Sequence, residues 1–144
     1  MLTATWLYLI EGIPDKNIYA IDNSLRLLAY ALQLVAVLIF YLSLQPINVK
    51  VFLGIKAFPE DTEPFVIKGI YGYIRHPMYS STLLFLLARP TQSVNSLTLI
   101  VVIALYFIIG SRLEEQRLLS DHPEYDTYRQ HVPAFIPSVR KKND

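Results

Sequence analysis

The chain has 144 residues, enough for a single domain, and 53% of them are hydrophobic while only 17% are charged. The apolar residues form long runs, which indicates a membrane protein, and the formal net charge of +1 gives no indication of nucleic-acid binding. The sequence contains no cysteine, so disulfides, thiolate metal sites and a thiol nucleophile are excluded. Its three histidines, His76, His122 and His131, lack the close spacing of common metal motifs, and no metal cofactor is expected.

The first half of the chain contains the clearest candidate for a membrane-spanning helix. Residues 1–10 are apolar but too short to span, so we expect an interfacial or packed segment there. Residues 25–44 are mostly apolar, and roughly 20 residues at 1.5 Å rise match a hydrocarbon core of about 30 Å. Pro46 ends this helix. Residues 49–56 then mix lysines with apolar residues, as membrane-surface helices do, and residues 59–64 form a polar loop.

The second half carries two more apolar helices. Pro77 suits a first helical turn, because its missing N–H has no intrahelical partner there. The apolar stretch 78–88 is about half as long as a span should be, so a short or strongly tilted helix is expected, ended by a turn at 89–93. Residues 97–109 are apolar and contain no proline. We expect them to continue as one helix into the charged stretch 112–119.

A short helix is predicted near the C-terminus. Asp121 is a candidate N-cap, and Glu124 follows it at the spacing of a capping box. The helix would carry Tyr125, Tyr128 and Val132 on one face. We expect these tyrosines to pack on the long helix or to anchor at the interface, rather than to act in catalysis.

Together these elements predict an all-α integral-membrane bundle of about three transmembrane helices, with interfacial and C-terminal helices, in one domain over residues 1–144. Ten of the thirteen Lys and Arg residues lie in residues 45–76 and 110–144. The positive-inside rule places these two segments, and with them the C-terminus, in the cytoplasm. Polar groups that are distant in sequence are then expected to meet at one membrane interface.

The stretch 69–79 concentrates polar and aromatic residues at the entrance of an apolar segment. Arg75 and His76 lose hydration there unless they meet a partner. Such residues mark a functional site by default, either a ligand site or an internal relay. Simple anchoring of the helix at the headgroup level is the alternative.

Three blocks along the chain resemble the membrane methyltransferases that include isoprenylcysteine carboxyl methyltransferase and the phospholipid N-methyltransferases. The blocks are Gly69-x-Tyr71-x-x-x-Arg75-His76-Pro77-x-Tyr79, then Glu114-Glu115-x-x-Leu118, then Tyr125-x-x-Tyr128 with Val132-Pro133 and Ile136-Pro137. A hydrophobic hairpin of fitting length separates the first two. The resemblance implies an enzyme that uses S-adenosylmethionine, with its cofactor-binding half at about residues 63–137.

The resemblance also implies which residues bind this cofactor, although it leaves the catalytic residues unassigned. The implied set is Phe65, Val66, Tyr71, Arg75, His76, Pro77, Met78, Tyr79 and Glu114. Glu114 can pair with the α-ammonium group of the cofactor, and His76 or Arg75 can hydrogen-bond its carboxylate or ribose. The tyrosine rings can pack on adenine or face the sulfonium through their π clouds.

The methyl acceptor stays open between a prenylcysteine carboxylate, a thiol and a lipid amine, so the expected partners are a lipophilic or small molecule and membrane lipid. In the isoprenylcysteine enzymes an arginine is expected one turn before the first glutamate, where this chain has Gly110. Arg112, the nearest candidate for a substrate-binding cation, lies about 200° around the helix from that position. Residues 87–91 and 108–115 resemble the methanethiol S-methyltransferase branch, whose acceptor is a small thiol.

Adjacent glutamates point about 100° apart on a helix, so at most one is expected to line the site. By the resemblance this is Glu114, and we expect Glu115 to lie on a solvated face. The main alternative function is a non-catalytic membrane assembly or lipid-binding protein on the same scaffold. A third, a sterol-reductase-like enzyme with a nicotinamide cofactor, would need a much longer chain.

Overall fold

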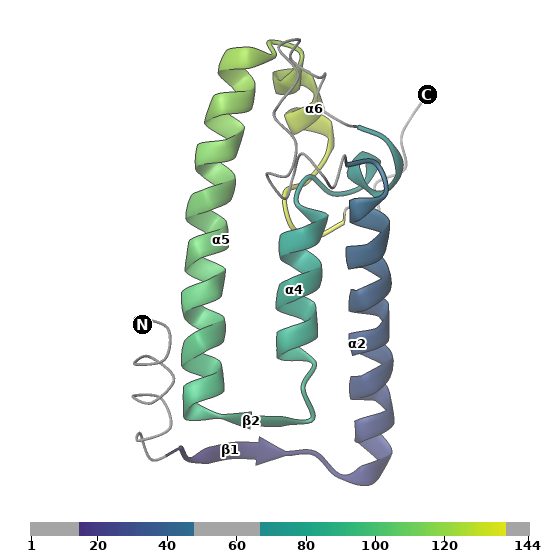
Figure 1. The fold of residues 1–144 in the computed structure, drawn as a ribbon, viewed down its shortest axis with the longest axis vertical. Helices are drawn as coiled ribbons and strands as arrows, with labels where there is room; N and C mark the ends of the chain where they lie inside the picture. The colour runs from purple at the N-terminus through teal and green to yellow at the C-terminus, as the bar shows by residue number, and fades with distance from the viewer. Residues whose placement is uncertain (1–14, 48–66, 138–144) are drawn as a thin grey trace, which may run out of the picture.

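The computed structural model describes residues 15–47 and 67–137 (Figure 1). This part of the chain is mostly helical, as predicted. Its elements are β1 (Asn17–Ala20), α2 (Asn23–Leu44), the 3-10 helix η1 (Gly69–Gly72), α4 (Pro77–Leu87), β2 (Thr91–Ser93), α5 (Val94–Asp121) and α6 (Tyr125–His131). The segments predicted at 1–10, 49–56 and 59–64 lie outside the described residues, as do Phe65 and Val66.

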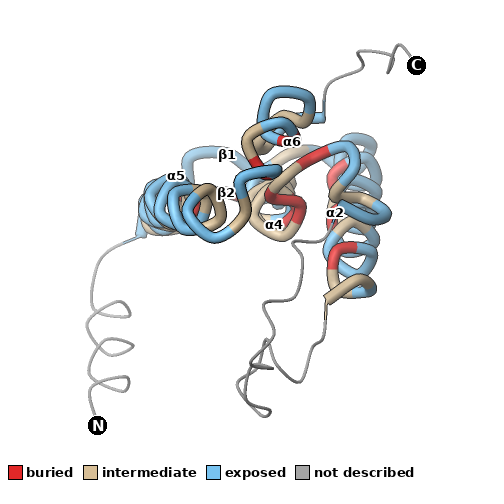
Figure 2. The backbone as a smooth tube through the Cα atoms, turned by 90° about the horizontal axis from the view of Figure 1, so that it is seen from above, coloured by how far each residue is buried: buried red, intermediate tan, exposed pale blue. Residues whose placement is uncertain are grey.

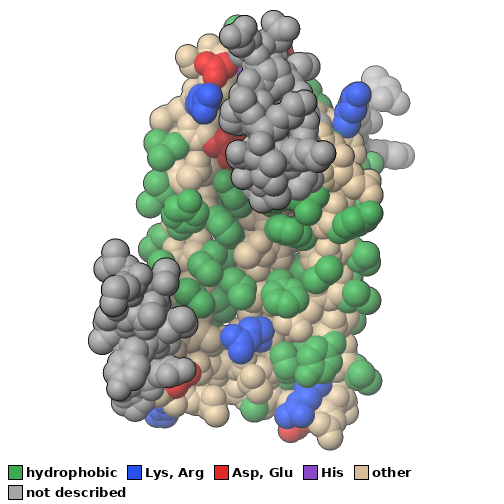
Figure 3. All heavy atoms as spheres, viewed as in Figure 1, with side chains coloured by type: hydrophobic (Ala, Val, Ile, Leu, Met, Phe, Trp, Pro, Cys, Tyr) green, Lys and Arg blue, Asp and Glu red, His purple; other side chains and the backbone are tan. Residues whose placement is uncertain are grey.

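Within residues 15–47 and 67–137, two helices are long and apolar enough to cross a membrane. They are α2, with 22 residues, and α5, with 28 residues, and their most apolar windows have mean hydropathies of 2.3 and 2.2. Most of their large apolar side chains are exposed. In Figure 3 the hydrophobic side chains gather over the middle of the molecule, while charged side chains lie toward its two ends. Helix α4 has only 11 residues, about 16 Å at 1.5 Å per residue, which is too short for an untilted span.

Helix α4 lies between α2 and α5 (Figure 1) and packs most closely on α2. The buried residues of α2 are Ala29, Ala36 and Ser43, which recur every seven residues and so share one face of the helix (Figure 2). Small side chains allow the backbones of neighbouring apolar helices to approach closely. Gln33, on the same face, donates a hydrogen bond from Nε2 to the Phe85 carbonyl of α4 at 3.2 Å.

One end of the helical layer is closed by a two-stranded ribbon. Strand β1 pairs antiparallel with β2 in the register Tyr19 to Gln92 and Ala20 to Thr91. Gln92 is 1% exposed. Its Nε2 donates to the Leu86 carbonyl at 2.8 Å, and its Oε1 accepts from Ser96 Oγ at 2.6 Å. The segment predicted as a simple turn therefore also contains a strand, which pairs with the residues that precede α2.

At the opposite end, α5 continues well beyond its apolar stretch before the chain turns into α6 (Figure 1). The predicted capping box was wrong, because Asp121 is the last residue of α5 and Glu124 caps α6 without a side-chain hydrogen bond. Tyr125 and Tyr128 are both buried, as the predicted tyrosine face requires, but Val132 is not part of the helix, because it is the extended C-cap residue of α6. The helix α6 and the residues after it thereby approach η1 and the start of α4.

Candidate functional site

The site is built on the residues that lead into α4. Gly69 has φ +64°, a left-handed conformation that suits glycine, and it begins η1. Pro77 occupies the first turn of α4, as predicted. The backbone N–H groups of Arg75 and His76 donate to the carbonyls of Pro133 and Ala134, each at 2.9 Å. The segment after α6 therefore fixes the backbone of the Arg-His pair, a role that could not be predicted from the sequence.

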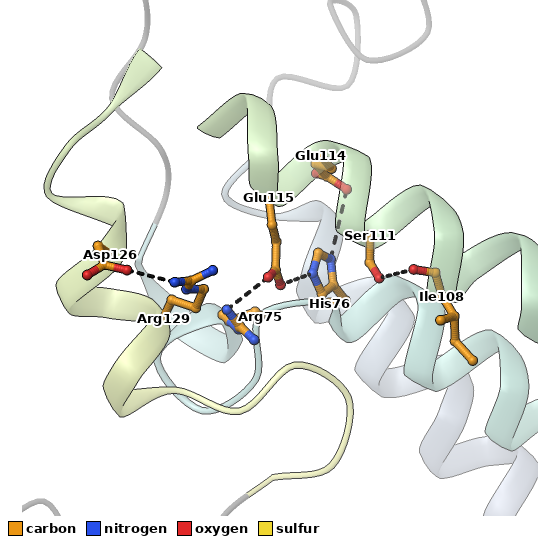
Figure 4. Close-up of polar contacts among 8 residues, drawn as sticks. All are labelled: Arg75, His76, Ile108, Ser111, Glu114, Glu115, Asp126 and Arg129. Atoms are coloured by element: carbon orange, nitrogen blue, oxygen red, sulfur yellow. Dashed lines mark hydrogen bonds and ion pairs between the residues drawn. The ribbon is translucent and has the colours of Figure 1, made fainter. Parts of the chain in front are cut away.

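Arg75, His76 and Glu115 form a buried ion cluster (Figure 4). Glu115 Oε1 lies 2.8 Å from His76 Nε2, and Glu115 Oε2 lies 3.2 Å from an Arg75 guanidinium nitrogen. The three side chains are 11%, 5% and 15% exposed for Arg75, His76 and Glu115. The prediction that Glu115 lies on a solvated face was wrong, because α5 is rotated so that this carboxylate meets the two basic residues.

Glu114 stands on the other side of the imidazole, and its side chain is 52% exposed. Tyr79 Oη donates a hydrogen bond to Glu114 Oε2 at 3.3 Å, and the same oxygen lies 3.9 Å from His76 Nδ1. In Figure 4 the His76 ring lies between the two α5 carboxylates. Both glutamates therefore approach the imidazole, one buried and ion-paired, the other open to solvent.

Aromatic rings extend from the imidazole along α5. The His76 and Tyr79 rings are stacked with centroids 5.5 Å apart and an interplanar angle of 7°. Tyr79 stacks in turn on Phe107, with centroids 4.5 Å apart, and Phe135 packs against His76 at 5.5 Å. We did not predict Phe107 or Phe135 as site residues. Phe107 precedes Glu114 by two helical turns, a spacing that places both on one face and could have revealed it.

Tyr71 connects η1 to two other elements. Its Oη donates to the Ser43 carbonyl at the end of α2 at 3.3 Å, and its own carbonyl accepts from Tyr128 Oη at 2.5 Å. Burial raises the pKa of Tyr71 to about 12, and the charges of Glu114 and Tyr79 add to this rise. Burial likewise raises the pKa of Tyr125 to about 12, with Glu115 adding to the rise and Arg75 opposing it. Both phenols are therefore neutral at physiological pH.

Arg112 is not brought into this cluster, since its side chain is exposed and makes no hydrogen bond or ion pair within the described residues. Gly110 leaves open space, because a Cβ added there would meet no atom within 4 Å. Met78 is half-buried, and its carbonyl accepts hydrogen bonds from Ser81 and Thr82. No group of three or more His, Cys, Asp or Glu side chains in the described ranges is placed to hold a metal ion.

The chemistry of the open side suits a cationic organic ligand. Glu114 Oε1 has no hydrogen-bond or ion-pair partner among the described residues, and it belongs to a half-exposed carboxylate beside stacked aromatic rings. A carboxylate attracts an ammonium group, and π faces attract other cations. Arg75, by contrast, is already engaged by Glu115.

Residues 25–124 match the model of the phospholipid methyltransferase family, which is more than two thirds of the chain. The chain belongs to this family. The matched region holds α5, all of α2 except its first two residues, and the four residues Arg75, His76, Glu114 and Glu115. As a member of a phospholipid methyltransferase family, it is related to enzymes that require a methyl donor.

Among individual relatives, this family member is similar to methanethiol S-methyltransferases. It is 35% identical to the enzyme of Crocosphaera subtropica over 80 residues, which cover 55% of this chain and 31% of the relative. It is 34% identical to the enzyme of Pseudomonas deceptionensis over 73 residues, which cover 50% of this chain and 28% of the relative. It is also 36% identical to the cobalt-zinc-cadmium resistance protein CzcN of Cupriavidus metallidurans over 78 residues, 51% of this chain and 36% of that protein. The match thus spans about a third or less of each relative. No solved structure matches the chain.

Proposed function

We propose that this protein is an integral-membrane methyltransferase that takes its methyl group from S-adenosylmethionine and transfers it to a small thiol. The observation that carries the proposal is the half-exposed carboxylate of Glu114, held beside stacked aromatic rings at one end of two candidate spans. S-adenosylmethionine carries two cationic groups, an α-ammonium and a sulfonium, which this side of the site suits.

In the proposed site, Glu114 pairs with the ammonium group and Tyr79 presents its ring near the sulfonium. Tyr71 and Met78 complete the wall next to the adenosine. His76 hydrogen-bonds the donor, and Arg75 and Pro77 form the rigid lead-in behind it. Phe65 and Val66 belong to the proposed set by resemblance.

The methyl donor supplies an activated methyl group on a sulfonium, and transfer is an in-line displacement. The residues of this chain then contribute mainly by orientation and by excluding water, and orientation is worth up to about 7–11 kcal/mol in well-aligned systems. The buried ion cluster serves this purpose, because Glu115 and the backbone bonds from Pro133 and Ala134 hold the Arg-His pair in one position.

The positions of the arginine side chains in the described residues favour an uncharged or thiol acceptor over a carboxylate. Arg75 is ion-paired with Glu115, Arg112 is exposed, and Gly110 offers no side chain one turn before Glu114. A carboxylate acceptor would therefore lack a dedicated cation. The printed names of the methanethiol S-methyltransferase relatives support the same choice.

We place the site on the cytoplasmic face. The proposed topology has three membrane segments, with α4 as a short third segment between the two long helices, within one domain over residues 1–144. The excess of Lys and Arg in residues 45–76 and 110–144 supports this orientation.

Calorimetric titration with S-adenosylhomocysteine in detergent tests the proposal. We expect saturable binding by the wild type and a loss of about tenfold or more in His76→Ala and Glu114→Ala, since each removes a charge-assisted or hydrogen-bonding contact. His131→Ala and Glu124→Ala, which alter exposed residues on or beside α6, serve as matched controls and should bind as the wild type does. Normal binding by both site variants would show that the site assignment is wrong.

A methyl-transfer assay with alkanethiols, prenylcysteines and amino-phospholipids then separates the two candidate functions. Thiol methylation would support the proposal. Binding of the cofactor product without transfer to any acceptor would favour the alternative, a non-catalytic membrane assembly or lipid-binding protein on the same scaffold.

A further inference from the structure

A small polar hollow lies at the ribbon end of the molecule, far from the candidate site. Its volume is about 180 Å³, and its wall consists of polar side chains, which include Asp15, Asn17, Arg89, Thr91 and Ser96. Pockets for drug-sized ligands usually measure about 300–1,000 Å³. The hollow therefore suits a small polar group.

Arg89 and Asp15 give this hollow one charge of each sign. Arg89 is exposed and makes no ion pair or hydrogen bond within residues 15–47 and 67–137. Asp15 Oδ1 accepts a hydrogen bond from the Asn95 N–H at 3.1 Å, while its other carboxylate oxygen has no hydrogen-bond partner in the described part of the chain. The two side chains line one hollow without forming an ion pair with each other. Both charges are therefore available to a ligand.

The length of α4 determines where Arg89 lies. This helix ends at Leu87 after about 16 Å, roughly half of a hydrocarbon core, and the chain then continues to the ribbon at the end of α2 and α5 (Figure 1). Arg89 thus lies where the chain leaves an apolar segment for the membrane surface. An arginine at such a boundary extends its guanidinium toward lipid phosphates, to which it can donate two parallel hydrogen bonds.

From these charges we infer that the hollow binds the headgroup of a zwitterionic phospholipid with a primary ammonium group. The lipid phosphate binds Arg89, and the ammonium binds the free carboxylate oxygen of Asp15. A lipid that carries the phosphate alone satisfies Arg89 but brings its negative charge close to Asp15 with nothing to balance it. The inference depends on neither the methyl donor nor the acceptor, because the hollow lies at the opposite end of the helices from the candidate site.

Apolar side chains beside the hollow favour a lipid over a soluble phosphate ester. Leu87, two residues before Arg89, is 54% exposed, and Val94, directly after Ser93 of the wall, is 46% exposed. The acyl chains of a bound lipid can cover this apolar surface, whereas a free ester would leave it uncovered.

A bound headgroup also connects the two segments that form the ribbon. Asp15 precedes β1 and Arg89 precedes β2, so one ligand contacts both strands' lead-in residues. A ligand that binds only the folded state stabilises it. We therefore expect the lipid to raise the Tm of the wild type in detergent, and to raise it less in Arg89→Gln.

Native mass spectrometry of the delipidated protein in detergent, without a methyl donor, measures the binding directly. The probes are phosphatidylethanolamine and, with the same acyl chains, phosphatidylglycerol, which has the phosphate but no ammonium. We expect the wild type to bind phosphatidylethanolamine about tenfold more tightly. Arg89→Gln should lower the affinity for both lipids about tenfold, and Arg89→Lys, which keeps a cation, should restore part of it.

Asp15→Asn tests the ammonium half of the site. The amide keeps an oxygen for the Asn95 N–H, so the start of α5 retains this hydrogen bond while the negative charge is removed. We expect the affinity for phosphatidylethanolamine to fall toward that for phosphatidylglycerol, and the affinity for phosphatidylglycerol not to fall.

Arg26→Gln and Asp22→Asn are the matched controls. Both residues are exposed at the same end of the molecule, and neither lines the hollow. Each control should bind both lipids within about twofold of the wild type.

Wild-type affinity for phosphatidylethanolamine in both Arg89→Gln and Asp15→Asn would overturn the inference. An equal loss in Arg26→Gln would do the same, because it would show a general attraction of headgroups to arginines at this surface. Glycerophosphoethanolamine has the same headgroup without acyl chains, and binding as tight as that of the lipid would assign the hollow to a soluble ester instead.

Discussion

Tyr128 Oη donates a hydrogen bond to the backbone carbonyl of Tyr71 at 2.5 Å, joining α6 to η1 across 57 residues of sequence. Tyr128 is only 9% exposed, so its removal leaves the carbonyl without this donor in a part-buried position. We predict that Tyr128→Phe lowers the free energy of unfolding by about 1–3 kcal/mol, measured by denaturant titration in detergent.

Tyr73→Phe is the control for this change, because Tyr73 follows the same 3-10 helix but is 69% exposed. Its stability should match that of the wild type within about 0.5 kcal/mol. Equal stability of the two variants would mean that the Tyr128 bond contributes nothing to the folded state.

The long helices could be predicted because their causes are local. Apolar runs and prolines predicted the ends of α2 and α5 to within a few residues of where the structure has them, and Pro77 predicted the start of α4. The ribbon could not be predicted in this way. Its strands have four and three residues and lie about 70 positions apart, so their pairing depends on tertiary structure that brings the two segments together.

The site was predicted in its residues but not in its internal connections. Helical spacing says that Glu114 and Glu115 point in different directions, but not which direction faces α4. That rotation is set by packing along the whole of α5, and it places Glu115, not Glu114, against Arg75. Phe135 was missed for a related reason: its contact with His76 depends on how the segment after α6 folds back.

Gly69 and Gly110 should respond in opposite directions to substitution by alanine. Gly69 has φ +64°, and alanine costs about 1–2 kcal/mol in that region. Gly110 lies inside α5, where a Cβ meets nothing within 4 Å, so Gly110→Ala should gain up to about 1 kcal/mol from helix propensity. Free energies of unfolding of both variants check this prediction. A loss of stability in Gly110→Ala would show that its open space is filled by another part of the chain.

The ribbon should affect stability without affecting the site. Gln92→Leu removes the donor to the Leu86 carbonyl and the acceptor for Ser96, so we predict a loss of about 2 kcal/mol or more. Figure 1 places this ribbon at the far end of the helices from α6. S-adenosylhomocysteine affinity of the folded variant should therefore stay within about twofold of the wild type. Gln116→Leu, at an exposed position of α5, controls for the change of side chain.

Titration of Tyr71 should make stability depend on pH in the alkaline range. Burial, followed by the charge of Glu114, raises its pKa from 10.0 to about 12 in the folded protein. The folded state therefore holds this proton more tightly than the unfolded state does. The resulting stabilisation is complete below pH 10 and is lost as the pH rises toward about 12.

The difference in tyrosinate absorbance between the wild type and Tyr71→Phe isolates this titration from the other nine tyrosines. We expect its midpoint near pH 12, and a lower midpoint when the same difference is measured in a Glu114→Gln background, because a negative charge near the phenol is removed. A midpoint at the ordinary value of 10.0 would mean that the phenol is solvated, and that η1 does not hold Tyr71 against the end of α2 and the carboxylate of α5.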